Sequence, residues 1–208
     1  MSDPRKEIVQ AGYDAMAEHY VDWGGRVEGD PRARFLEEFS RSLPEGARVL
    51  DLGCGAGVPS TQLLAERFEV VGVDISQAQL RLAKKNVPQA SFIQADLAEL
   101  TFPDEEFAGI TAFYSISHVP REEHAELFRR TAAWLEPGGL LLATLGAGGG
   151  DWTGEWLGVP MFFSSYDADT NRALLNAAGF ELLHDEVVEM QEPEGVASFL
   201  WALGRKSR

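Results

Sequence analysis

The sequence has little sulfur and little positive charge. A single cysteine, Cys54, stands among 208 residues, which excludes an intramolecular disulfide framework and a cysteine-rich zinc site. Lysine and arginine number 18 against 33 aspartate and glutamate residues, so the formal net charge is −15. Nucleic-acid binding depends on neutralising phosphates, and the basic clusters here are short and scattered. We therefore expect no binding to DNA or RNA.

Long apolar runs are also missing. No segment approaches the ~18 consecutive apolar residues of a membrane span, and the charged residues 1–7 lack the apolar stretch of a signal peptide. We expect a cytoplasmic protein without membrane contact.

Hydrophobic residues make up 45% and charged residues 25%, as in ordinary globular domains, and no low-complexity linker divides the chain. One domain over residues 1–208 is the resulting expectation, with no prediction of oligomeric state.

Short apolar segments alternate with longer amphipathic ones through most of the chain. Strands are predicted at 47–52, 69–74, 90–95, 107–114, 140–145, about 180–189 and 196–203, and helices at about 58–67, from 76, at 121–135 and at 167–178. This rhythm is typical of an α/β, Rossmann-like three-layer sandwich, in which a mostly parallel sheet carries helices on both faces.

Two segments fall outside the alternation. Residues 1–45 read as helical, at about 8–20 and 32–42, and are expected to form an N-terminal helical lid. Residues 146–166 follow the fifth strand and are rich in aromatic side chains without a clear period. Because they start where a strand ends, they are expected to form a cap over that edge of the sheet.

Glycines and acids gather at the predicted strand ends. Gly53, Gly55 and Gly57 follow the first strand, Asp74 ends the second and Asp96 follows the third. Ligands of open α/β sheets bind at the carboxyl ends of the strands. Glycines let the backbone approach a ligand closely, and an acid about 20 residues further on suits the hydroxyls of a ribose. The pattern indicates an adenosine-containing cofactor.

The details of the turn favour one cofactor over another. The dinucleotide fingerprint requires a third glycine where this chain has Val58, and Asp51 would repel a pyrophosphate. A ligand with an ammonium group would gain from Asp51, since hydrogen bonds to charged groups contribute about 1.5–3 kcal/mol. S-adenosylmethionine carries an ammonium, a ribose and no phosphate. An NAD-linked oxidoreductase stays as the less favoured alternative.

The motifs together resemble class I S-adenosylmethionine-dependent methyltransferases. The resemblance rests on VLDLGCGAG at 49–57, VDIS at 73–76, QADL at 94–97 and WLEPGGL at 134–140. YDAMA at 13–17, followed by Tyr20, is similar to the small-molecule branch, the type 11/25-like methyltransferases. The resemblance implies a seven-stranded sheet with an antiparallel last strand, and methyl transfer to a small molecule with S-adenosylhomocysteine as product.

The same resemblance implies roles for single residues. Gly53, Gly55 and Gly57 would lie under the methionine and ribose, Asp74 would bind the ribose, Ile75 would pack on the adenine, and Asp96 with Leu97 would recognise its amine. Asp51 would orient the amino end, Tyr13 and Tyr20 would close over the carboxylate side, and Tyr114 and Ser115 would lie beside the reactive methyl.

The acceptor side is predicted from position alone. His118 follows the fourth strand and is a candidate general base, the alternative being a loop histidine that caps the next helix. Trp152, Trp156, Met161 and Phe163 are candidates for an apolar acceptor wall, or else they seal the cap onto the sheet. Methyl transfer from a sulfonium requires no metal, and none is predicted. A cofactor-binding regulatory protein without turnover stays as a second alternative, and the acceptor is not identified.

Overall fold

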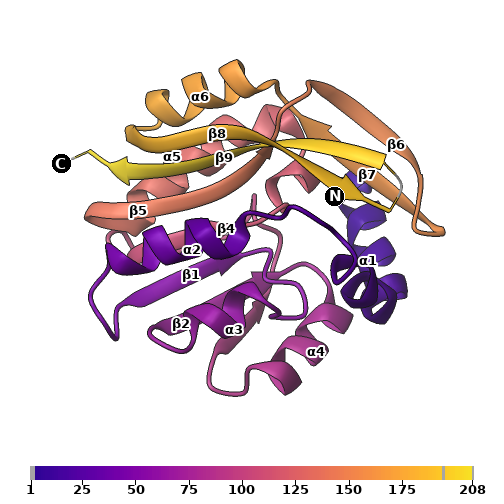
Figure 1. Cartoon of the computed structure of the whole chain (residues 1–208), viewed down its shortest axis with the longest axis horizontal. Helices are drawn as coiled ribbons and strands as arrows, with labels where there is room; N and C mark the ends of the chain where they lie inside the picture. Colours follow the sequence, from indigo (N-terminus) through magenta and orange to yellow (C-terminus); the bar gives the residue numbers. More distant parts are fainter. Residues whose placement is uncertain (1–2, 194, 208) are drawn as a thin grey trace.

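The computed structural model describes residues 3–193 and 195–207 (Figure 1). Its elements are, in order, α1 (Pro4–Gly24), α2 (Arg32–Arg41), β1 (Arg48–Leu52), α3 (Ser60–Leu64), β2 (Glu69–Asp74), α4 (Gln77–Asn86), β3 (Ser91–Gln94), β4 (Phe107–Ala112), η1 (Ile116–His118), η2 (Arg121–Glu123), α5 (His124–Trp134), β5 (Leu135–Gly146), β6 (Gly150–Trp156), β7 (Val159–Ser165), α6 (Ala168–Ala177), β8 (Phe180–Glu192) and β9 (Gly195–Lys206).

Seven strands form one sheet in the order β3-β2-β1-β4-β5-β9-β8. Neighbouring strands from β3 to β5 run parallel, whereas β9 is antiparallel to both β5 and β8. The predicted seven-stranded sheet with an antiparallel last strand is confirmed. The strand order reverses at β1, because β2 lies on one side of β1 and β4 on the other. The carboxyl end of β1 therefore lies at the switch point where α/β sheets bind ligands.

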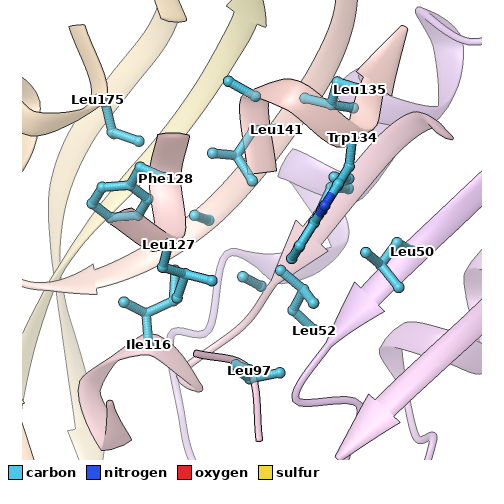
Figure 2. Packing of buried hydrophobic residues seen from close by; sticks show 14 of the residues in the cluster. Leu50, Leu52, Leu97, Ile116, Leu127, Phe128, Trp134, Leu135, Leu141 and Leu175 are labelled. Atoms are coloured by element: carbon cyan, nitrogen blue, oxygen red, sulfur yellow. The ribbon is translucent and has the colours of Figure 1, made fainter. Parts of the chain in front are cut away.

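The central strands are apolar because both faces of the sheet are covered. On one face α5 and α6 pack against β1, β4 and β5 through Leu127, Phe128 and Leu175 (Figure 2). On the other face α2 and α3 pack through residues that include Phe39 and Leu64. Strand β4 is buried at every position, as expected for parallel strands between two helical layers.

The predicted cap is a β-hairpin. Strands β6 and β7 pair antiparallel as a separate two-stranded sheet, which lies beside α1 in Figure 1. Met161 and Phe162 of β7 are buried against Val9 and Met16 of α1. A lone hairpin is marginally stable in water, so the contact with α1 stabilises both segments.

Several element boundaries differ from the predicted ones, among them those of α1, α3 and β5. Helix α3 has five residues and starts at Ser60, because Pro59 has no N–H to continue a helix and occupies the N-cap. Strand β5 begins at Leu135, directly after α5, and so starts five residues before the predicted position 140, with an irregularity in its pairing with β4. Across the described ranges, no helix is both long and apolar enough to cross a bilayer.

Helix α2 lies tightly on the sheet at Gly109 of β4. A Cβ atom built at Gly109 would lie 2.5 Å from Cζ of Phe39 and 2.6 Å from Cδ1 of Leu43. Both side chains are buried. The glycine therefore sets how closely α2 approaches the sheet, and with it the place of Arg32 at the start of that helix.

We expect Gly109→Ala to lower the free energy of unfolding by about 1–3 kcal/mol, because the added methyl overpacks a closed interface. Gly24→Ala is the control, since a Cβ at Gly24 meets nothing within 4 Å, and it should not destabilise. Urea denaturation followed by circular dichroism measures both. Equal stability of the two variants would contradict the close packing of α2.

Candidate functional site

Two adjoining cavities open at the carboxyl ends of β1, β2 and β4. The first is lined by Gly53, Gly55, Asp74, Ile75, Asp96 and Leu97, and further by Tyr13, Tyr20, Tyr114, Ser115 and His118. The second has a volume of about 630 Å³ and shares with the first cavity the residues Tyr13, Tyr20, Gly53, Gly55, Tyr114 and His118. Small-molecule sites typically have volumes of about 300–1,000 Å³. The structure thus brings nearly all of the predicted cofactor residues to one place.

The first glycine of the turn lies where no side chain fits. Gly53 has φ of +74°, and a Cβ atom there would lie 2.1 Å from Cβ of Ser115. The Ser115 hydroxyl donates to the carbonyl of Leu52 at 2.7 Å, which holds the loop after β4 against the turn. The backbone at the end of β1 therefore stays open toward both cavities.

Gly57 does not lie in the cavity wall, where it was predicted together with Gly53 and Gly55. It lines neither cavity, and a Cβ atom there would lie 3.1 Å from Cγ2 of Val87 and 3.4 Å from Cβ of Ala83. Its φ of +77° also favours glycine. Gly57 lets α4 pack against the turn, and does not form the floor of either cavity.

Asp74 is a buried carboxylate held by the backbone. Its Oδ2 accepts from the N–H of Gly55 at 2.9 Å and its Oδ1 from the N–H of Ser76 at 2.8 Å. Burial raises the pKa of Asp74 to about 6, although both hydrogen bonds favour the ionised form. Each oxygen keeps a second lone pair toward the first cavity, where it can accept from a hydroxyl group.

Asp96 lies on the same cavity and pairs with a lysine. Lys6 Nζ of α1 is 2.9 Å from Oδ2 of Asp96 and 2.7 Å from Oε2 of Glu123. Oδ1 of Asp96 accepts from the N–H of Ala98 at 2.9 Å. This buried lysine ties the start of α1 to the loop after β3.

A second polar contact fixes α1 above the cavity. Oδ1 of Asp14 accepts from the Ser76 hydroxyl at 2.7 Å and from the N–H of Ala78 at 2.9 Å. The Ser76 hydroxyl in turn caps α4 by accepting from the N–H of Gln79, as serine commonly does at a helix N-terminus. A carboxylate at a helix N-terminus also interacts favourably with the helix dipole. Helix α1 covers the first cavity through these two anchors.

Both ring nitrogens of His118 are occupied. Nδ1 lies 2.9 Å from the carbonyl oxygen of Phe162, which can only accept, so Nδ1 carries the proton. Nε2 is therefore an acceptor, and the Tyr13 hydroxyl donates to it at 2.7 Å. Burial lowers the pKa of His118 to about 4 and raises the pKa of Tyr13 well above its usual value. The pair therefore stays neutral at neutral pH.

Tyr114 lies in strained backbone at the boundary of the two cavities. Its φ of +57° is in the left-handed region, which costs a residue with a Cβ atom of order 1–3 kcal/mol. The N–H of Tyr114 donates to the Thr144 hydroxyl at 2.5 Å, and its ring packs on Phe199 and Trp201. These contacts hold the loop after β4 at the cavity wall.

The four predicted acceptor residues of the hairpin separate into two pairs. Trp156 and Phe163 line the second cavity, with their ring centroids 5.4 Å apart. Met161 is fully buried and packs on α1, and Trp152 is 47% exposed, so neither lines a cavity. Met161 and Phe163 lie on the same face of β7, and Trp152 and Trp156 on the same face of β6, so their positions along the strands separate them and the alternation does not.

Asp51 forms a buried network at the second cavity. Its two oxygens accept from the hydroxyls of Thr61 at 2.6 Å and Thr111 at 2.8 Å. Burial raises the pKa of Asp51, while these hydrogen bonds and the nearby Arg32 oppose that shift. The sequence predicted a site role for Asp51 but none for Thr61, Thr111 or Arg32.

Site roles for Lys6 and Asp14 were not predicted either, because their contacts join distant parts of the sequence. The contacts of Lys6, Asp14 and Arg32 join residues 28 to 117 positions apart, and no local pattern marks such pairs. Asp14 alone carried a signal, since it stands inside the motif at 13–17 next to a tyrosine assigned to the site.

Comparison with known proteins bears on the same region. Residues 49–139, from β1 into β5, match the model of a family described as a methyltransferase domain. The chain is 46% identical over 129 residues to a trans-aconitate 2-methyltransferase of Variovorax paradoxus, covering 58% of this chain and 49% of the relative. It is 32% identical over 162 residues to the 27-O-demethylrifamycin SV methyltransferase of Amycolatopsis mediterranei, covering 68% and 59%.

A solved structure agrees over the full length. The 1,6-didemethyltoxoflavin-N1-methyltransferase of Burkholderia thailandensis, crystallised with its substrate and S-adenosylhomocysteine, has a TM-score of 0.73 at 18% identity. The match covers 100% of this chain and 92% of that one. This likeness shows the fold, and the chain spans about half the length of the curated relatives it matches. Residues 49–139 thus match a methyltransferase domain, and the whole chain shares the fold of a methyltransferase crystallised with S-adenosylhomocysteine.

Proposed function

We propose that the chain transfers a methyl group from S-adenosylmethionine to a small-molecule acceptor. One observation carries the proposal: a cavity lined by the glycine turn and Asp74 opens into a second cavity walled by Trp156 and Phe163. A cofactor site and an acceptor site would then meet at Tyr13, Tyr114 and His118. The relatives named above for trans-aconitate and demethylrifamycin support a small-molecule acceptor.

The residues present fit the cofactor. Gly53 and Gly55 place backbone without side chains in the wall of the first cavity, and Asp74 offers two carboxylate oxygens in the same wall. Ile75 and Leu97 provide apolar surface for an adenine, and Asp96 an acceptor for its amine. When bound, S-adenosylmethionine supplies both the activated methyl and its own leaving group. The chain's task is to hold the reacting atoms in line and to exclude water, which can contribute about 7–11 kcal/mol.

His118 acts in this proposal as a positioning residue. The prediction of a general base requires a free lone pair and a pKa near neutrality. The structure instead has Nε2 accepting from Tyr13, and burial lowers the pKa of His118 to about 4. His118 would fix the Tyr13 hydroxyl so that its oxygen presents lone pairs to the cavity, where they orient an acceptor that donates a hydrogen bond.

Binding of S-adenosylhomocysteine tests the cofactor assignment. Ribose hydroxyls prefer the ionised form of Asp74, whose pKa is about 6. Affinity should therefore be constant above about pH 7 and fall by up to about tenfold per pH unit below pH 6. Asp74→Asn should bind roughly 10–100-fold more weakly at pH 8 and lose this pH dependence. Titration calorimetry measures both, and tight binding of NAD without S-adenosylhomocysteine would refute the proposal.

The state of His118 is measurable without knowing the acceptor. We expect nitrogen-15 NMR to show the Nδ1–H tautomer unchanged from pH 9 to pH 6, because protonation breaks the hydrogen bond from Tyr13 and is disfavoured by burial. Titration should occur near pH 4. A midpoint near the ordinary value of 6.5 would restore the general-base hypothesis.

Two tryptophans of β6 allow a controlled test of the proposed acceptor cavity. A radiolabelled S-adenosylmethionine assay against a panel of organic acids, phenols and amines should reveal a methylated product. With that acceptor, Trp156→Ala should raise KM by about tenfold or more, because the side chain lines the second cavity. Trp152→Ala should leave KM unchanged, since Trp152 is exposed outside the cavities. No turnover with any acceptor would favour a binding protein.

A further inference from the structure

Acidic side chains outnumber basic ones in the wall of the second cavity. Of the described residues that line it, one is basic, Arg32, and three are acidic, namely Asp30, Asp51 and Glu192. The Arg32 guanidinium already has a counterion, since its Nη2 is 3.0 Å from Oδ2 of Asp30. His118, in the same wall, is neutral near pH 7, because burial lowers its pKa to about 4. An anionic acceptor would therefore meet an excess of like charge in this cavity.

Aromatic rings form another part of this wall, where α1 meets the hairpin β6–β7. The ring centroid of Trp156 lies 5.9 Å from that of Tyr20, 5.3 Å from that of Trp23 and 5.4 Å from that of Phe163. All four side chains line the second cavity. The faces of aromatic rings carry negative partial charge and attract a cation within about 6 Å. A wall of this composition suits an ammonium group.

The acidic and aromatic parts of the wall lie close to each other. Glu192 is the last residue of β8 and lines the cavity together with the rings. Burial raises the pKa of Tyr13 most, and the negative charges of Asp74 and Glu192 raise it further. The ring centroid of Tyr13 is 5.1 Å from that of Tyr20 and 6.5 Å from that of Trp156. The negative charge of Glu192 therefore acts on the same aromatic group that would contact a cation.

The second cavity also has a side that is open to solvent. Gly24, Gly25 and Gly148 line it and are exposed. The net charge of −15 favours the approach of cations over that of anions. A positively charged solute can thus enter from water and reach the aromatic wall.

We propose that the methyl acceptor is an organic amine, which the aromatic and acidic wall of the second cavity selects over neutral and anionic compounds. The inference rests on the proposed function and names its substrate class. The ammonium first releases its proton to water, and the nitrogen lone pair then forms the bond to the methyl carbon. The electron pair of the broken methyl–sulfur bond stays on sulfur, so the positive charge passes from sulfur to nitrogen. The rings and Glu192 stabilise the charge that develops on nitrogen.

Ligand binding to the chain saturated with S-adenosylhomocysteine tests this selection without turnover. Choline and 3,3-dimethylbutan-1-ol have the same shape, but choline alone carries a positive charge. Ligand-observed NMR titration should show choline binding about tenfold more tightly than the neutral alcohol. Trans-aconitate, a tricarboxylate, should bind more weakly than either. No preference for choline over the alcohol, or tighter binding of trans-aconitate than of choline, would overturn the inference.

Two substitutions test the two parts of the wall. Glu192→Gln removes the charge and keeps the shape, and Trp156→Leu keeps an apolar side chain without an aromatic face. Each should lower the ratio of the choline affinity to the alcohol affinity by about threefold or more. Glu189→Gln is the matched control, since Glu189 is exposed in the same strand and lines neither cavity, and it should leave the ratio unchanged. Thermal melting establishes that each variant is folded, and an unchanged ratio in both cavity variants would contradict the inference.

Turnover separates this inference from the proposed function. In the radiolabelled assay the methylated compounds should be amines. For an alkylamine, kcat/KM should rise about tenfold per pH unit from pH 7 to pH 9, because only the neutral nitrogen has a lone pair to donate. Methylation of carboxylic acids or phenols in place of amines would overturn the inference and leave the proposed function standing. Failure of the unmodified chain to bind S-adenosylhomocysteine would overturn the proposed function itself.

Discussion

The burial of a carboxylate at the end of β2 is the constraint around which the site is arranged. Asp74 is only 9% exposed, yet backbone N–H groups of Gly55 and Ser76 satisfy one lone pair on each oxygen. A buried charge without partners is costly. The glycine turn therefore has two functions: at Gly53 it lets Ser115 pack directly on the backbone, and it delivers the N–H of Gly55 to the acid. Burial raises the pKa of Asp74 despite these hydrogen bonds.

Helix α1 closes the site by polar contacts at its two ends and apolar contacts between them. Lys6 pairs with Asp96 and Glu123, Asp14 caps α4, and Tyr13 donates to His118. The hairpin β6–β7 packs on the same helix through Met161 and Phe162. Ion pairs and hydrogen bonds of this kind specify position more than they stabilise. The first cavity thus has Asp74 and Asp96 in its wall, and the second has the aromatic side chains of Trp156 and Phe163.

Much of the fold was predictable from local patterns. The order of short apolar and amphipathic segments indicated the parallel sheet, and the Ser76 cap predicted where α4 starts. The hairpin was not predicted, because β6 and β7 mix apolar and polar residues on both sides, and one side is covered by α1 instead of the sheet. The length of α3 was overestimated because Pro59 occupies its N-cap.

The site was predictable where residues follow a strand directly. Asp74, Gly53 and Ser115 are placed by the end of a strand, and the structure has them lining one cavity. Arg32 and Lys6 come from helices that dock across the sheet edge, so their place depends on packing such as that of α2 against Gly109. The role of His118 depended on which groups occupy its two nitrogens, which only the folded arrangement reveals.

A crystal structure of the chain with S-adenosylhomocysteine tests the central claim most directly. The account predicts both ribose hydroxyls within about 3.2 Å of the Asp74 carboxylate, with the backbone of the turn at 53–55 beneath the ligand. A ligand bound elsewhere, or a ribose turned away with Asp74 contacting protein atoms alone, would contradict it.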